Sequence, residues 1–267
     1  MTPPLELCCM TVRQATLPEL IAVAGHAGFD SLTATPFLVA KAGMPPADLR
    51  RRCDDAGVMI GYIDGLCSPL PGTPEGVTEE RCFAMAEDLG APAVNVVHFG
   101  GHPVPFGQMA DVLGELAERA ARRGLRILME FLPDTGIPDL EVALNLARTV
   151  GHGNLAVMLD TWHLARTGGG PDQLVGDAAA LIGGLQVSDR RAVQDTLPYV
   201  PMSGRYLPGE GELPLRAIVG PVVAAHRDLP VGVEVINDEL LALPAAGAAS
   251  TAAAALRNLL DGTPPSS

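Results

Sequence analysis

Short apolar runs alternate along the chain with longer amphipathic stretches. Eight of these runs have the length and composition of buried strands: Leu5–Val12, Ser31–Ala34, Val58–Ile63, Ala93–His98, Arg126–Glu130, Ala156–Asp160, Gly184–Ser188 and Gly232–Ile236. The amphipathic stretches predict helices at Leu17–Ala27, Pro46–Ala56, Thr78–Leu89, Gln108–Arg123, Asp139–Val150, Pro171–Ala179, Leu213–Ala225 and Ala246–Leu260. Strands that alternate with helices in this way favour a parallel sheet.

The number of strand–helix units predicts how this sheet is arranged. Eight units in 267 residues predict a single-domain α/β fold, a (β/α)₈ TIM barrel over residues 1–261, followed by a C-terminal tail at residues 262–267. Glycines follow most predicted helices, where a left-handed residue often ends a helix. A doubly wound open sheet is the alternative. It usually carries a glycine-rich loop after its first strand, and Thr11–Thr16 has no glycine.

Four polar residues lie at or near the ends of the last four predicted strands: Glu130, Asp160, Gln186 and Glu234. A carboxylate at the end of a buried strand is costly unless a cation meets it. In a barrel, the carboxyl ends of neighbouring strands line one mouth, where the chemistry of such folds is concentrated. We therefore expect these side chains to bind one divalent metal ion, unless they are scattered polar residues in ordinary loops. Their oxygen atoms favour Mn²⁺, Mg²⁺ or Co²⁺ over Zn²⁺.

Other polar residues follow the same strand ends. His163 lies three residues after Asp160 and is a candidate for proton transfer, or else it caps the next helix. Arg205, in a loop rich in glycine and proline, is a candidate for binding a carboxylate or phosphate of the substrate, or else it is solvated. Trp162 and His98 are candidates for substrate contact, and a packing role is the alternative for Trp162. Weaker candidates are His102, Asp64, Glu6, Cys8 and Asp189.

Composition and charge restrict the classes of partner. The net charge of −13 argues against a nucleic-acid partner and gives no sign of a polybasic membrane contact. No run approaches the roughly 18 uncharged apolar residues that span a bilayer, and no signal peptide is evident. The five cysteines have a spacing that fits neither a zinc knuckle nor a redox pair. We therefore expect a cytoplasmic protein that acts on a small molecule.

Five segments together resemble the xylose-isomerase-like barrel superfamily, which includes sugar isomerases and epimerases, inosose dehydratase and endonuclease IV. The segments are Met129–Pro133, Leu159–His163, Leu185–Asp189, Arg205–Gly211 and Val233–Asp238. The resemblance is good over the C-terminal two thirds of the chain and weak over residues 1–90. It implies that Glu130, Asp160, Gln186 and Glu234 are the metal ligands. It also implies that Glu130 and Glu234 are the acid–base pair, that His163 is an acid or base, and that the protein is a homo-oligomer such as a dimer.

The resemblance implies two related activities, of which the first is our main interpretation and the second the alternative. The first is a metal-dependent isomerase or epimerase that removes a proton next to a carbonyl of a sugar-like or cyclitol-like substrate through a metal-stabilised enediolate. The second is a lyase of the 3-dehydroshikimate or inosose dehydratase type. Gln186 favours the lyase, because many sugar epimerases have histidine at this position. A non-catalytic binding barrel would be expected to lack some of the ligands, and six histidines with an acidic charge argue against an endonuclease.

Overall fold

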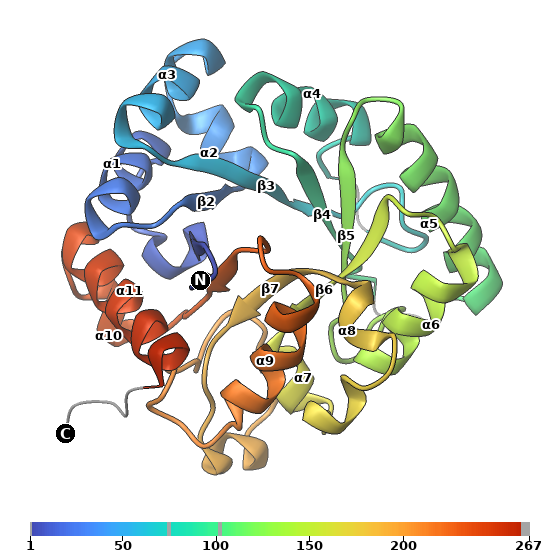
Figure 1. Cartoon of the computed structure of the whole chain (residues 1–267). Coiled ribbons are helices and arrows are strands. Elements are labelled where there is room, and N and C mark those ends of the chain that lie inside the picture. The colour runs from blue at the N-terminus through green and yellow to red at the C-terminus, as the bar shows by residue number, and fades with distance from the viewer. Residues whose placement is uncertain (1, 74–75, 101–102, 263–267) are drawn as a thin grey trace.

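Eight parallel strands close into a barrel in chain order, with β8 paired to β1 (Figure 1). The computed structural model describes residues 2–73, 76–100 and 103–262. The strands are β1 (Leu5–Leu7), β2 (Ser31–Ala34), β3 (Met59–Leu66), β4 (Ala93–Val97), β5 (Arg126–Glu130), β6 (Leu155–Asp160), β7 (Ile182–Val187) and β8 (Val231–Val233). The (β/α)₈ fold is therefore confirmed. The predicted tail, apart from Gly262, lies outside the described residues.

Helices surround the barrel on its outside (Figure 1). They are α1 (Leu17–Ala27), α2 (Pro36–Lys41), α3 (Pro46–Ala56), α4 (Glu79–Leu89), α5 (Phe106–Ala121), α6 (Leu140–Val150), α7 (Thr161–Arg166), α8 (Ala178–Leu181), α9 (Leu215–Ala225), α10 (Asp238–Leu241) and α11 (Ala245–Asp261). Glycines at the predicted helix ends have the left-handed backbone that a helix terminus favours, as Gly28 (φ 76°) and Gly57 (φ 68°) illustrate. None of the described helices is both long and apolar enough to cross a membrane.

Two predicted strands are shorter than expected for a shared reason. The first was predicted to reach Val12 but ends at Leu7, and a 3₁₀ helix follows at Cys9–Val12. The last was predicted to reach Ile236 but ends at Val233. The Thr11 hydroxyl donates to the Val233 carbonyl (2.9 Å) and accepts from the Val235 amide (3.0 Å). The Thr11 side chain therefore takes the place of the backbone hydrogen bonds that would continue the pairing of β1 with β8. Sequence periodicity does not reveal such a side-chain contact.

One predicted helix is broken into two pieces, and three short helices were not predicted. The predicted helix Pro171–Ala179 is a 3₁₀ turn at Pro171–Gln173 followed by α8, because Gly176 adopts a left-handed backbone (φ 65°) between them. The short helices α2, α7 and α10 were not predicted. Each has fewer than eight residues and begins directly after a polar residue whose side chain accepts an amide of the first turn: Thr35, Asp160 and Asn237.

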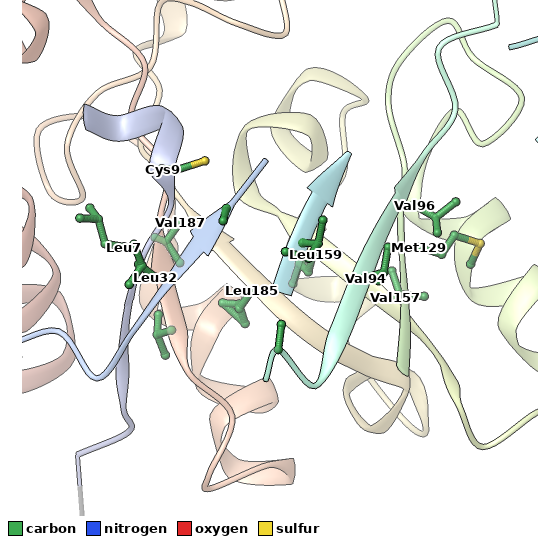
Figure 2. Packing of buried hydrophobic residues seen from close by; sticks show 14 of the residues in the cluster. Leu7, Cys9, Leu32, Val94, Val96, Met129, Val157, Leu159, Leu185 and Val187 are labelled. Carbon is green, nitrogen blue, oxygen red and sulfur yellow. The ribbon is translucent and has the colours of Figure 1, made fainter. Parts of the chain in front are cut away.

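The alternation of side chains along each strand positions the site. In β5, Ile127 and Met129 join the large core between strands and helices, whereas Leu128 joins a small cluster inside the barrel. Figure 2 shows outward residues of neighbouring strands packed together, among them Leu159 and Leu185, which are paired in register. The residues between these outward positions point inward. Glu130 lies two residues after Leu128, on the same face of β5, and is therefore directed into the barrel.

The amino-terminal end of the barrel contains a buried acid. Glu6 is 4% exposed, and its carboxylate accepts a hydrogen bond from the Ser31 hydroxyl (2.8 Å). A Cβ atom at Gly61 would collide with this carboxylate. Burial raises the pKa of Glu6 to about 7, although the Ser31 hydrogen bond opposes the rise.

This shift predicts how stability depends on pH. The native state holds the Glu6 proton more tightly than the unfolded state, so this group's contribution to stability is complete below pH 4.5 and is lost as pH rises through 7. Urea unfolding should therefore show that Glu6→Gln gains about 1–3 kcal/mol relative to the unsubstituted protein at pH 8 and little at pH 4. Glu118→Gln, an exposed control on α5, should show no such pH dependence. An equal effect of Glu6→Gln at both pH values would contradict the assignment.

Candidate active site

The four strand-end residues predicted from the sequence come together at the carboxyl-terminal mouth of the barrel. Glu130 ends β5, Asp160 ends β6, Gln186 lies in β7, and Glu234 directly follows β8. Asp160 and Gln186 are paired in register across β6 and β7. All four side chains are buried, with exposures of 7%, 0%, 1% and 5%. The barrel therefore holds three carboxyl groups and one carboxamide out of water, an arrangement that requires compensating positive charge.

Arg205 supplies part of that charge. Its Nη1 atom donates to Asp160 Oδ2 (2.7 Å) and to Glu234 Oε2 (2.6 Å), and the side chain is 2% exposed. The solvated alternative for this residue is therefore wrong. Burial alone would raise the pKa of Asp160, but Arg205, His163 and the hydrogen bonds to this carboxylate together outweigh burial and hold that pKa below its usual value. Burial raises the pKa of Glu234 well above its usual range despite the same arginine, and Asp160 and Glu130 add to this rise.

His163 lies between two of the acids. Its Nε2 atom is 3.2 Å from Glu130 Oε1 and 3.4 Å from Asp160 Oδ2. Asp160 caps α7 by accepting the Trp162 amide (2.7 Å), and the three-residue spacing places His163 over the carboxylate one turn later. The other ring nitrogen, Nδ1, is 2.7 Å from the Tyr199 hydroxyl. This second contact fixes the orientation of the imidazole ring.

Glu130 has a second contact, which the sequence analysis did not identify. Asn95, which lies in β4, donates from Nδ2 to Glu130 Oε2 (2.7 Å) and to Asp64 Oδ1 (2.8 Å). Burial, followed by the charge of Glu130, raises the pKa of Asp64 to about 7. The signal for Asn95 was present, because an isolated polar residue between valines in a buried strand has the parity that points inward.

In the Gln186 side-chain amide, the nitrogen atom has a hydrogen-bond partner and the oxygen atom has none. Its Nε2 atom donates to the Tyr62 hydroxyl (3.0 Å). Among the described residues, this buried Oε1 has no hydrogen-bond partner. A buried oxygen in this position fits a metal ligand, because a cation would satisfy it without a donor from the protein. The hydrogen bond to Tyr62 restricts the rotation of this amide group.

The Tyr62 contact leads to a direct test. We expect Tyr62→Phe to weaken Mn²⁺ binding about tenfold, because the Gln186 amide would lose the acceptor that fixes its orientation. Isothermal titration with Mn²⁺ measures this change. Tyr206→Phe serves as a control, since Tyr206 lies in the loop after β7 and packs against Arg191. Equal Mn²⁺ affinity in Tyr62→Phe and the unsubstituted protein would show that Tyr62 does not orient the ligand.

The donor atoms fit a divalent metal ion. Glu130, Asp160 and His163 each place one donor atom within 4.8 Å of the others. Glu234 belongs to a second such group, with Cys8 and Asp64. The side-chain oxygen atoms of Glu130, Asp160, Gln186 and Glu234 are of the type that suits Mn²⁺, Mg²⁺ or Co²⁺. Cys8 lies on the far side of Glu234, and its thiol donates to Glu234 Oε1 (3.0 Å). Burial raises the pKa of the Cys8 thiol, so this residue serves as a hydrogen-bond donor.

Two predicted substrate contacts lie elsewhere. His98 is fully buried between two loops, with Nε2 2.8 Å from the Pro71 carbonyl and Nδ1 accepting the Gly136 amide (2.9 Å). Both nitrogens are thus used by the backbone, and this geometry favours loop anchoring over substrate binding. Trp162 is 3% exposed and packs beside Arg166. Neither His98 nor Trp162 is among the described residues that line the cavity. His102 lies outside the described residues.

A cavity of about 190 Å³ opens above the acids. Titratable and apolar residues both line this cavity. The titratable ones are Asp64, Glu130, His163, Arg205 and Glu234, and the apolar ones include Met10, Val97, Phe99, Leu132 and Met202. Larger hollows lie elsewhere, among them one of about 600 Å³ beside α9, one of about 590 Å³ at the opposite end of the barrel, and others of about 560 and 230 Å³. The small cavity is the candidate active site, because the buried acids, the histidine and the arginine converge there.

A closed (β/α)₈ barrel with acidic groups at its carboxyl-terminal mouth defines a recognisable class of protein. Residues 21–259 match the family described as xylose isomerase-like TIM barrel, and the chain belongs to this family. It is 31% identical over 240 residues to a 3-dehydroshikimate dehydratase of Pseudomonas aeruginosa, covering 86% of this chain and 37% of that protein. It is 26% identical over 261 residues to a 3-dehydroshikimate dehydratase of Pseudomonas putida, covering 92% and 39%.

The chain thus spans about two fifths of the length of these two curated relatives. The solved structure of the IOLI protein with a zinc atom is similar over 98% of this chain and 99% of that one. The two share a TM-score of 0.84 and 19% identity, which is a likeness of fold.

Proposed function

We propose that this chain is a divalent-metal-dependent lyase that removes water from a hydroxylated cyclic keto acid of the 3-dehydroshikimate type. The observation that carries the proposal is the position of His163, which lines the cavity with its Nε2 atom 3.2 Å from Glu130. Dehydration requires one group to take a proton from carbon and another to give a proton to the departing hydroxyl. The two curated relatives named 3-dehydroshikimate dehydratase support this choice of substrate class.

In this reaction Glu130 is the base and His163 is the acid. Glu130 takes the proton from the carbon next to the substrate carbonyl, and the electrons of that bond form the new double bond. His163 protonates the hydroxyl as its carbon–oxygen bond breaks, and water leaves. A metal ion held by Glu130, Asp160, Gln186 and Glu234 would supply positive charge for the substrate carbonyl. Because Glu130 and His163 are in contact, the proton that Glu130 has taken can pass to His163, which is then ready for the next turnover.

A metal-dependent isomerase or epimerase is the second candidate. Glu130 and Glu234 both line the cavity, from β5 and from the end of β8. Two carboxylates that reach one substrate from different strands suit a reaction in which one removes a proton and the other returns a proton to the opposite face. This arrangement requires Glu234 to exchange a proton with the substrate, whereas the lyase uses Glu234 as a ligand only.

Product analysis in heavy water separates the two candidates. The protein with MnCl₂ is incubated with 3-dehydroshikimate and with a set of ketoses, and the products are followed by absorbance and mass spectrometry. We expect loss of one water molecule from 3-dehydroshikimate and a new ultraviolet absorbance, both abolished by EDTA. Deuterium incorporation into a ketose without loss of water would favour the isomerase. If no substrate changes, with Mn²⁺ shown to be bound, both candidates are wrong.

A further inference from the structure

We propose that the hollow of about 590 Å³ at the amino-terminal end of the barrel is a second small-molecule site, which binds a flat hydroxylated carboxylate such as a phenolic acid. Its volume is within the range of about 300–1,000 Å³ that is usual for ligand sites. None of the described residues lines both this hollow and the candidate active site. The inference therefore goes beyond the proposed function and does not depend on it.

Glycines explain why the barrel is hollow at this end. Layers of inward side chains normally fill the interior of such a barrel. Here Gly61 in β3 and Gly183 in β7 line the hollow. A Cβ atom at Gly61 would collide with the Glu6 carboxylate, and one at Gly183 would collide with Ala156 and come within 3.2 Å of Arg126 Nη2. The missing side chains thus leave room for one acid and one arginine at the base of the barrel.

An apolar layer closes the hollow toward the mouth. Tyr62, Ala93 and Leu128 line the hollow and also belong to the small cluster inside the barrel. The Tyr62 hydroxyl accepts a hydrogen bond from Gln186, which does not line the hollow. The Tyr62 ring and the two aliphatic side chains therefore offer an apolar surface, which suits the flat ring of a ligand.

Arginine provides the end of the site that binds an anion. Arg126, the first residue of β5, and Arg227, in the loop before β8, both line the hollow and are exposed. Neither side chain has a hydrogen bond or ion pair with another described residue. A guanidinium group without an acid partner can bind a carboxylate through two parallel hydrogen bonds. Asp228 also lies at the rim, but two arginines outweigh it and disfavour a cationic ligand.

The opposite wall provides polar groups that suit a hydroxyl. Glu6 in β1 and Ser31 in β2 line the hollow, are 4% and 1% exposed, and contact each other at 2.8 Å. A carboxyl group and a hydroxyl together can both accept from and donate to a hydroxyl group of a ligand. β1 and β5 are four strands apart in either direction around the closed barrel, so Glu6 and Arg126 lie on opposite walls. A ligand with a hydroxyl at one end and a carboxylate at the other fits this separation.

Three related compounds test the site on the unsubstituted protein. The probe is 4-hydroxybenzoate, and NMR titration at pH 7 compares it with benzoate, which lacks the hydroxyl, and with 4-hydroxybenzyl alcohol, which lacks the carboxylate. We expect the probe to bind with saturation. Benzoate should bind about threefold to tenfold more weakly, and the alcohol at least about tenfold more weakly.

A substitution assigns the carboxylate to Arg126. We expect Arg126→Gln to bind 4-hydroxybenzoate at least about tenfold more weakly and to bind the alcohol as the unsubstituted protein does, because the alcohol has no group for the arginine to bind. The matched control is Arg52→Gln, an exposed arginine of α3, which should leave all three affinities unchanged. Arg126 is exposed, so both variants should melt at the temperature of the unsubstituted protein.

Three outcomes would overturn the proposal. The first is the absence of saturable binding of 4-hydroxybenzoate at millimolar concentration. The second is equal affinity of Arg126→Gln and the unsubstituted protein for this probe, which would place the probe elsewhere, for example at the mouth of the barrel. The third is displacement of the probe by an equal concentration of inorganic phosphate, which would show a general anion site. Failure of the proposed dehydration would leave this proposal standing, because the two sites share no described lining residue.

Discussion

Replacement of Glu130 by glutamine is expected to lower turnover by at least about 10³-fold without unfolding the barrel. The substitution removes the proposed base and one negatively charged ligand in a single step, while the amide keeps the size of the side chain. Because burial of three carboxyl groups opposes folding, loss of one charge should leave the stability of the metal-free protein unchanged or higher. The checks are steady-state kinetics with saturating Mn²⁺ and urea unfolding.

The control for this prediction is the same chemical change elsewhere. Glu118→Gln, on the exposed side of α5, should retain full activity and full stability. Full activity in Glu130→Gln would refute the assigned role. A variant that unfolds would instead assign Glu130 a structural role through its contacts with Asn95 and His163.

Replacement of His163 by alanine is expected to lower turnover about 10²–10³-fold and to change Mn²⁺ affinity much less. His163 lies beside Glu130 and Asp160 and lines the cavity, as a group that exchanges a proton with the substrate should. Tyr199→Phe, which keeps the ring but removes the hydroxyl that contacts His163, should lose activity by only about tenfold. Kinetics and Mn²⁺ titration on the same preparations separate the two effects.

The opposite pattern would assign His163 a different role. If His163→Ala loses the metal and regains normal turnover at high Mn²⁺ concentration, then the histidine is a metal ligand and another group is the acid. The three donor atoms of Glu130, Asp160 and His163 lie close enough together for that arrangement, so the measurement is decisive.

The fold could be predicted because its signals are local. Each buried strand is a short apolar run, each helix has its own periodicity, and glycine marks the joints between them. The same alternation directs Glu130 and Asp160 into the barrel, since each occupies the last inward position of its strand. Convergence of strand-end residues then follows from closure of the sheet, which brings the ends of β5, β6, β7 and β8 to one mouth.

The contacts that complete the site depend on residues distant in sequence. Gln186 and Tyr62 are 124 positions apart, and only the closed barrel brings them into contact. Arg205 and Tyr199 lie in the long connection after β7, which has no periodicity from which a side-chain direction could be inferred. Arg205 was therefore recognisable from the sequence as a functional candidate, and only the structure shows that it contacts the protein's own acids.

The position of His98 away from the cavity could not be predicted for a related reason. His98 directly follows a strand, just as Glu234 does, but both of its imidazole nitrogens contact backbone atoms of two other loops. Position at the end of a strand indicates proximity to the mouth of the barrel. The direction of a side chain beyond the last paired residue depends on the neighbouring loops, which differ in length and in hydrogen bonding.

Anomalous X-ray scattering from crystals grown with Mn²⁺ tests the central claim most directly. The account predicts one strong peak at the mouth of the barrel, in contact with oxygen atoms of Glu130, Asp160, Gln186 and Glu234. Absence of a peak among these residues at saturating Mn²⁺ would contradict it.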